Sequence, residues 1–117
     1  MLPEVQIQQS RRSSMSVAII RTGHARSAYW APFRDQQAVA AYALSDTEII
    51  AYGQKGRLAV YDLAAARTLR ECETGQNFGT CQIAPDRRWL WILSHNGVSC
   101  WETSSLLRTG LFDAVEL

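Results

Sequence analysis

The chain has no long apolar run and no paired cysteines. None of its hydrophobic stretches approaches the ~18–20 residues of a membrane-spanning helix, and residues 1–12 lack the charged and apolar regions of a secretory signal. The three cysteines, Cys72, Cys81 and Cys100, are an odd number without paired spacing, so they do not predict a disulfide framework. We therefore expect a reduced, cytoplasmic protein.

An excess of one charge is also missing. The 117 residues carry a formal net charge of +1, and every basic residue except Lys55 is an arginine. Basic residues are adjacent only at Arg11–Arg12 and Arg87–Arg88, which we interpret as solvated surface. This balance does not predict binding to nucleic acid or to an anionic membrane surface. The length is that of one domain.

The sequence contains no constellation typical of an enzyme. The segment 75–79 has two glycines four residues apart, but it lacks the Lys and the strand-to-helix setting of a phosphate-binding loop. His95 has no Ser or Cys with an assignable orienting acid near it in sequence, and we interpret His95 and His24 as surface turn residues. Zinc would need close-spaced ligand pairs, so Cys81 and Cys100 are expected to be small buried hydrophobes. We expect no catalytic residues, no cofactor and no metal.

What the chain does have is a repeat between Ala43 and Glu102. Asp46 matches Asp86, and Tyr61 matches Trp101, both at a separation of 40 residues. A repeat of ~40–45 residues that holds four short strands is typical of a propeller blade. The sequence therefore predicts an all-β fold of antiparallel four-stranded blades, which form a partial β-propeller.

Short apolar runs that end at Gly, Asn, Pro or Asp predict the strands of these blades. Asn96–Gly97 is a strong hairpin signal between two of the runs. A helix over residues 35–44 is the alternative that helix propensity favours. The predicted strands are 38–42, 49–52, 58–61, 68–72, 79–83, 89–93, 98–101 and 105–109, with 111–115 as one more strand of the next blade or of the N-terminal one.

Two segments precede the repeat. Residues 1–15 are polar and rich in Gln, Ser and Arg, so we expect a flexible arm, or at most a short edge strand at 5–7, before a blade domain at 16–117. The runs 17–20 and 27–30 resemble the middle strands of a truncated blade, in which Trp30 ends a strand as Tyr61 and Trp101 do later.

These residues give the repeat a resemblance to the WD40 family of β-propellers. The family's Trp-Asp pair is matched by Tyr61–Asp62 and Trp101–Glu102, and its Ser-Pro-Asp turn by residues 44–46 and 84–86. Its Asp-Gly hairpin is matched by Lys55–Gly56 and Asn96–Gly97. Gly75–Gln76 stands where the family has Gly-His, so the family's usual hydrogen-bonded network cannot form in its usual way. The resemblance covers residues 38–110 and implies a divergent WD40-like fold or a propeller of a neighbouring family.

A blade has two apolar faces and is stable only when it is stacked on others. Two full blades and part of a third are fewer than the four to eight of a closed propeller. Three solutions remain open at this point: self-association into a ring, for which three chains would supply seven to nine blades, docking on a partner, or end faces covered by the arm and the tail. We favour a homo-oligomer or a protein partner.

Aromatic and acidic side chains recur within the repeat. An aromatic platform for a base or a sugar is one interpretation of the aromatic residues, but their positions within strands favour a role in the core between blades. The aspartates recur once per blade, which indicates turn chemistry rather than catalysis. The aromatic set is Trp89, Trp91, Trp101, Tyr52 and Tyr61, with Trp30 partly exposed, and the acidic set is Asp46, Asp62 and Asp86.

The leading hypothesis is a non-enzymatic protein-interaction module, a scaffold or adaptor that binds through surface loops. A narrower form is a bacterial immunity-type inhibitor that masks another protein's active site. The alternative is a carbohydrate-binding or enzymatic propeller with its site in a channel made by several chains, where Tyr42, Thr80 and Gln82 are the polar residues available. The predicted partner-binding loop residues are Gln54, Lys55, Gln76, Asn77, His95 and Asn96.

Overall fold

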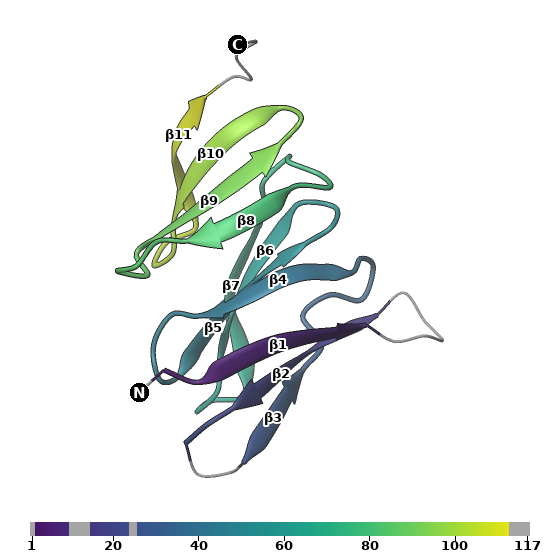
Figure 1. Cartoon of the computed structure of the whole chain (residues 1–117), viewed down its shortest axis with the longest axis vertical. Coiled ribbons are helices and arrows are strands. Elements are labelled where there is room, and N and C mark those ends of the chain that lie inside the picture. The colour runs from purple at the N-terminus through teal and green to yellow at the C-terminus, as the bar shows by residue number, and fades with distance from the viewer. Residues whose placement is uncertain (1, 10–14, 24–25, 113–117) are drawn as a thin grey trace.

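Three antiparallel sheets make up the part of the chain that the computed structural model describes, residues 2–9, 15–23 and 26–112 (Figure 1). Every regular element in these ranges is a strand, so the helical alternative at residues 35–44 is wrong. The strands are β1 (Glu4–Gln9), β2 (Ser16–Arg21), β3 (Ser27–Trp30), β4 (Ala38–Ala43), β5 (Glu48–Gly53), β6 (Arg57–Asp62), β7 (Arg67–Glu73), β8 (Thr80–Ile83), β9 (Trp89–Ser94), β10 (Gly97–Glu102) and β11 (Leu107–Phe112).

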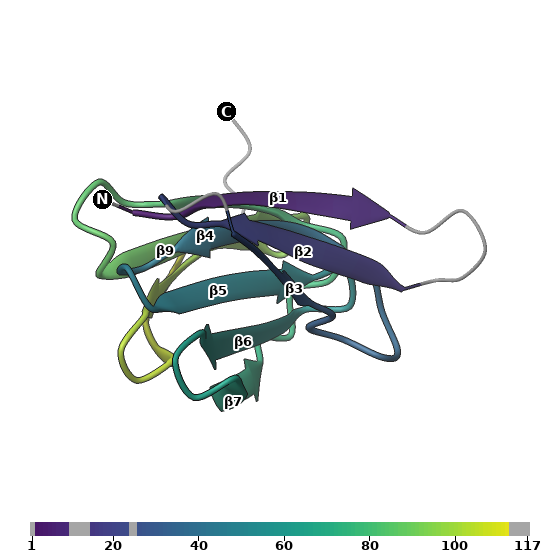
Figure 2. The same cartoon turned by 90° about the horizontal axis from the view of Figure 1, so that it is seen from below.

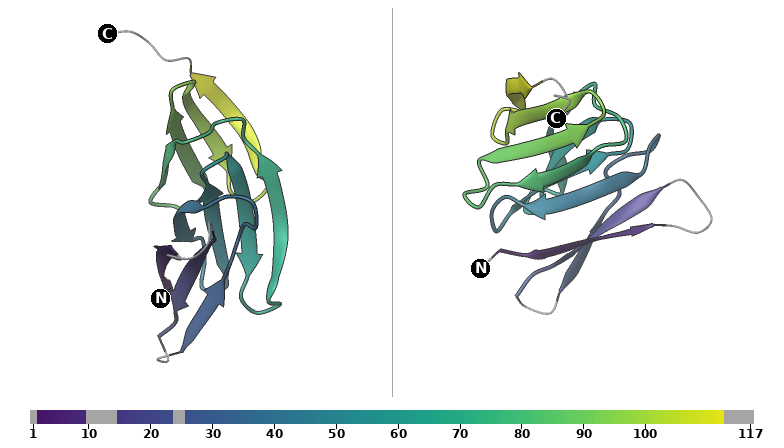
Figure 3. Two further views of the ribbon diagram at one scale, coloured as in Figure 1. Left: turned by 90° about the vertical axis from the view of Figure 1, so that its right-hand side faces the viewer. Right: turned by 45° about the horizontal axis from the view of Figure 1, so that its top comes forward.

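Each sheet is a simple meander, and we call the three sheets blades 1, 2 and 3 in chain order. Blade 1 has the strand order β1-β2-β3, blade 2 has β4-β5-β6-β7, and blade 3 has β8-β9-β10-β11. The blades stack face to face along the longest axis of the molecule (Figures 1 and 3). Within blade 2, the strands succeed one another from one edge of the sheet to the other (Figure 2). The expected all-β, partial-propeller architecture is confirmed.

Two apolar cores hold the stack together, one at each joint between blades. At the first joint Ala18 and Ile20 of blade 1 pack against Ile49 and Ala51 of blade 2. The rings of Trp30 and Tyr61 stack across the same joint, with centroids 4.9 Å apart and planes within 15°. Stacked aromatic pairs add about 0.5–1.5 kcal/mol to the burial of their area. Trp30 is buried, not partly exposed as predicted.

The second joint is made by larger side chains. Blade 2 contributes Ile50, Tyr52, Leu58 and Val60, all of them buried. Blade 3 covers this face with four residues, Leu90, Ile92, Trp101 and Leu106. Because residues on both faces of β5 and β6 are needed for the two joints, these strands are apolar without alternation, as their sequences predict.

The two strands predicted for the truncated first blade occupy different positions in that blade from those that the sequence predicts. Ala18 of β2 lies opposite Trp30 of β3, as Leu58 of β6 lies opposite Cys72 of β7. In each blade these residues face the following blade. The segments 17–20 and 27–30 therefore correspond to the third and fourth strands of a blade, not to the middle two, and Trp30 is the counterpart of Cys72 rather than of Tyr61.

The ends of the blade region also differ from the predictions. Residues 4–9, within the predicted flexible arm, form β1 at the edge of blade 1, in the position of a second strand. The alternative of a short edge strand therefore describes this segment. The division of the chain at residue 15 stays a prediction. At the other end β11 joins the two predicted strands 105–109 and 111–115 into one, and residues 113–117 lie outside the described ranges.

Candidate functional site

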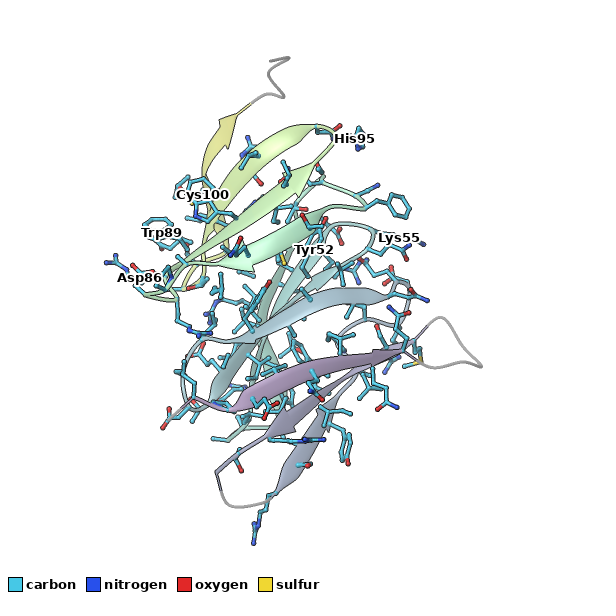
Figure 4. All side chains as sticks on the ribbon, in the orientation of Figure 1. Tyr52, Lys55, Asp86, Trp89, His95 and Cys100 are labelled. Carbon is cyan, nitrogen blue, oxygen red and sulfur yellow. The ribbon has the colours of Figure 1, made fainter. Side chains whose placement is uncertain are left out.

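Three loops meet at one end of blades 2 and 3, and we call this surface the loop face. It consists of the β5–β6 hairpin (residues 54–56), the β9–β10 hairpin (residues 95–96) and the linker between the blades (residues 74–79). Lys55 and His95 lie at this end in Figure 4, whereas Asp86 and Trp89 lie at the other end. The antiparallel meander explains this grouping, since alternate turns of a blade must fall at the same end.

The linker is fixed to blade 2 by the buried Tyr52. The Tyr52 hydroxyl donates a hydrogen bond to the carbonyl of Gln76 and accepts one from the Gly79 amide at 3.2 Å. The Phe78 amide donates to the carbonyl of Gln54 at 2.7 Å. Burial is the main cause that raises the pKa of Tyr52, which therefore stays a neutral phenol. The loop face is thus a set of tied loops rather than three independent ones.

The side chain of Gln76 ties the same linker to blade 3. Its amide nitrogen donates to the carbonyl of Gly97 at 3.1 Å and to the hydroxyl of Ser94 at 3.2 Å. Its amide oxygen accepts a hydrogen bond from the Ser99 hydroxyl, which in turn accepts one from the indole nitrogen of Trp101 at 2.7 Å. A glutamine thus supports a buried network where the WD40 family has its histidine.

An equivalent glutamine serves blade 2. Gln36 is buried in the linker after β3, and its side-chain oxygen accepts hydrogen bonds from the amides of Lys55, at 2.9 Å, and Arg57, at 3.4 Å. Gln36 and Gln76 are 40 residues apart, the period of the repeat. Gln36 was not singled out from the sequence because it precedes the segment in which the repeat is visible.

The structure brings the six predicted loop residues together but does not expose all of them. Lys55, Asn77, His95 and Asn96 are exposed, and Gln54 is partly exposed. Gln76 is only 3% exposed, and its amide is used inside the protein. The prediction that the Gln76 side chain contacts a binding partner is therefore corrected, because a buried side chain with internal hydrogen-bond partners cannot do so directly. His24 lies outside the described residues.

Phe78 is the residue of this face that the sequence analysis missed. It is 71% exposed, the highest exposure among the large apolar side chains described. Its φ of 55° lies in the left-handed region, which bulky residues rarely adopt. The only signal in the sequence was an apolar residue in a polar loop, between Asn77 and Gly79.

The opposite end of the blades carries the turns in which the aspartates recur. The carboxylate of Asp86 accepts a hydrogen bond from the Arg88 amide at 3.1 Å, and that of Asp62 accepts one from the Ala64 amide at 3.0 Å. The predicted turn role is confirmed for these two residues. In the first repeat, Ser45 rather than Asp46 accepts from the following amides.

The cysteines do not form a metal site within the described residues. Burial raises the pKa of the Cys81 thiol to about 12 and that of Cys72 to about 11. No group of three or more His, Cys, Asp or Glu side chains in the described ranges is arranged to hold a metal ion. All three cysteines are free thiols.

In the described part of the chain, no helix has the length and apolar character needed to cross a membrane.

The aromatic residues divide between the cores and the surface. Trp101 and Tyr52 are buried and Tyr61 is half-buried, as a core role predicts. Trp89 is half-buried and lies under the guanidinium of Arg88, 5.9 Å from its ring centroid. Trp91 is 42% exposed on the outer face of blade 3.

The polar residues considered for a channel site are used differently. The Tyr42 hydroxyl donates to the carbonyl of Cys81 at 2.7 Å, which ties β4 to β8. Burial is the first cause that raises the pKa of Tyr42 to about 12. Thr80 and Gln82 are exposed on blade 3. Tyr42 therefore has a structural role at the joint between blades 2 and 3.

Comparison with solved structures identifies the fold that this geometry belongs to. The chain superposes on the WD40 β-propeller domain of Doa1 with a TM-score of 0.67 and 11% sequence identity, over 95% of this chain and 41% of that one. The C-terminal WD40 domain of Sif2 matches with a TM-score of 0.62 and 15% identity, over 88% of this chain and 32% of that one. The described chain is a stack of WD40-like propeller blades.

These matches concern the fold alone, because sequence identity is low. The chain spans less than half of each of the two WD40 domains. No protein-family model matches the sequence, and no curated protein matches it. The divergence is visible in the residues themselves, since Gln76 and Tyr61 replace the His and Trp of the WD40 pattern.

Proposed function

We propose that the chain is a non-enzymatic protein-interaction module that binds its partner through the loop face. The observation that carries this proposal is Phe78, a large apolar side chain held out into solvent by a tied loop. Burying a phenylalanine side chain contributes about 1.5–3 kcal/mol, and a central aromatic anchor within a polar rim is the common composition of a binding hot spot.

The surroundings of Phe78 fit this role. Its backbone amide is bonded to Gln54, and the neighbouring linker residue Gly75 accepts a hydrogen bond from the Asn96 side chain at 3.4 Å. A surface that is ordered before binding loses less conformational entropy when the partner arrives. The rim residues Lys55, Asn77 and His95 supply hydrogen-bond donors and acceptors for specificity.

We further propose a cytoplasmic location and the class of partner. The free thiols Cys72, Cys81 and Cys100 suit a reducing cytoplasm. In its narrower form the module acts as an adaptor or as an immunity-type inhibitor that covers the active site of a partner enzyme. If the chain is an inhibitor of this kind, adding it in purified form at a one-to-one molar ratio should abolish the activity of the partner enzyme.

Quantitative affinity capture from the native cells tests the proposal. The immobilised wild-type chain is compared with Phe78→Ala and with Leu107→Ala, a matched control that is 65% exposed at the opposite end of blade 3. We expect at least one protein to be enriched by the wild type and by Leu107→Ala, and to be reduced at least about tenfold by Phe78→Ala, the loss that 1.4 kcal/mol produces. Equal capture by all three chains would overturn the proposal.

A further inference from the structure

The centre of the outer face of blade 3 is apolar, and we call its four residues, Trp91, Leu93, Val98 and Cys100, the open face. The polar residues Thr80, Gln82 and Glu102 lie on the same side at its edges. Trp91 lies opposite Cys100, and Leu93 opposite Val98, so all four side chains lie on one side of the sheet. Leu90 and Ile92, which alternate with them, point into the joint with blade 2. Trp91 is 42% and Leu93 56% exposed.

The same positions in blade 2 form a joint. Ile50 lies opposite Val60, and Tyr52 opposite Leu58, in the register that the open-face residues repeat. In blade 2 these four side chains are buried under blade 3. The open face therefore has the composition of a surface that is covered by another sheet.

The other end of the stack is different. Blades 2 and 3 each direct an aliphatic–aromatic pair toward the preceding blade, Ile49 opposite Tyr61 and Leu90 opposite Trp101. At the matching position blade 1 has Glu4 opposite Arg21, both exposed. On the same outer face the exposed Gln6 and Gln8 lie opposite the partly buried Ile19 and Val17, and Tyr29 is 68% exposed beside Ile19. A polar outer face is what a terminal repeat needs for solubility. The outer face of blade 1 is thus mixed, with charged and amide side chains along β1 beside Val17, Ile19 and Tyr29, whereas the open-face residues of blade 3 include none that is charged or carries an amide.

We propose that the open face binds the open face of a second copy of this chain, which gives a twofold-symmetric dimer. Because the open face is more apolar than the mixed outer face of blade 1, contact between two open faces covers the more apolar end of each chain, and such a contact stops at two copies. Isologous contacts of this kind are the commonest in homo-oligomers. The closed ring considered from the sequence would instead need an apolar joint surface at both ends.

The details of the face agree with a self-complementary contact. Its four residues carry no charge, so contact between them in two copies places no like charges opposite each other; Glu102 lies on the same side of the sheet at the far end of β10. A hollow of about 140 Å³ lies beside the exposed side chains and is lined by Thr80, Cys81, Gln82, Trp91 and Leu93. In the proposed dimer the second copy covers this hollow.

Light scattering coupled to size exclusion tests this contact. We expect the wild-type chain to have twice the single-chain mass of 13.1 kDa, and Leu93→Arg to have the single-chain mass. Gln82→Arg, which introduces a charge at an exposed polar position opposite Trp91, should also give the monomer without altering the core. Tyr29→Arg, at an exposed position on the outer face of blade 1, is the matched control and should remain dimeric.

Four results would overturn the proposal. The first three are a monomeric wild type, a dimer that survives both Leu93→Arg and Gln82→Arg, and a dimer that Tyr29→Arg dissociates, which would show a head-to-tail contact. The fourth is a mass above that of two chains. The open face does not include Phe78, so Phe78→Ala should leave the dimer intact.

Discussion

Gln36 and Gln76 occupy equivalent positions in consecutive linkers, and each side chain is bonded to the hairpin of the blade that follows it. Gln36 binds the β5–β6 hairpin through its oxygen, whereas Gln76 binds the β9–β10 hairpin through both ends of its amide. The two residues fix how each linker lies against the next hairpin, and this geometry determines the loop face.

Replacing Gln76 by Ala should destabilise the fold. The change leaves the Gly97 carbonyl and the Ser99 hydroxyl without this buried partner, so we expect the free energy of unfolding to fall by about 2 kcal/mol. Gln36→Ala should lower it by about 1 kcal/mol. Urea denaturation measures both. Gln37→Ala, next to Gln36 in the chain, should change the value by less than about 0.5 kcal/mol, and an equal effect of all three changes would contradict the assigned role.

Arg70 should contribute more to stability than its partner Glu48. Its guanidinium donates to Glu48 at 3.1 Å and also to the carbonyl of Thr103 in blade 3 at 2.7 Å. Arg70→Met should therefore lower the free energy of unfolding by about 1–2 kcal/mol, since hydrogen bonds from a charged donor are the stronger class. Glu48→Gln should lower it by less than about 1 kcal/mol. A larger loss for Glu48→Gln in thermal unfolding would show that the contact with Thr103 contributes little.

The thiol of Cys81 should make stability fall at high pH. Its pKa is about 12 in the folded protein because of burial, above the value of about 8.5 for an unfolded cysteine. The folded state then retains a proton that the unfolded state loses, so this contribution is fully present below pH ~8.5 and is lost as pH rises toward 12. Urea denaturation at a series of pH values should show a flatter alkaline decline for Cys81→Ala. An unchanged slope would exclude Cys81 as the cause.

Phe78→Asn should stabilise the protein while it weakens partner binding. Asparagine tolerates a φ near 55° better than a bulky residue does, and an exposed phenyl ring contributes little to the folded state. We expect a gain of about 0.5–1 kcal/mol in the free energy of unfolding. Phe78→Ala, which lacks the tolerance of asparagine, serves as the comparison. A loss of stability in Phe78→Asn would show that the ring packs against the protein.

Much of the blade architecture could be predicted from the sequence because it depends on local signals. Asn96–Gly97 and Lys55–Gly56 mark hairpins, and the apolar runs of β5, β6 and β9 require burial on two faces or at an interface. Blade 1 was assigned incorrectly because its third and fourth strands lack the turn residues of the later repeats. The position of a short strand within its blade depends on its pairing register with neighbouring strands, such as that of Ala18 with Trp30.

The loop face could be predicted only in part. Antiparallel connectivity places alternate turns at one end, so grouping Lys55, Asn77 and His95 needed no knowledge of side-chain packing. The burial of Gln76 and the exposure of Phe78 depend on which way each side chain of the linker points. That direction follows from the positive φ of Phe78 and from the bonds to Tyr52, which no local pattern encodes.

Photo-crosslinking from position 78 tests most directly whether the loop face is a binding surface. A chain that carries benzoyl-phenylalanine at residue 78 is expressed in the native cells and irradiated, beside a chain that carries it at residue 107. We expect a discrete crosslinked product with a second protein from position 78, and none of the same mass from position 107. Identical products from both positions, or no product from position 78, would show that the loop face is not the binding surface.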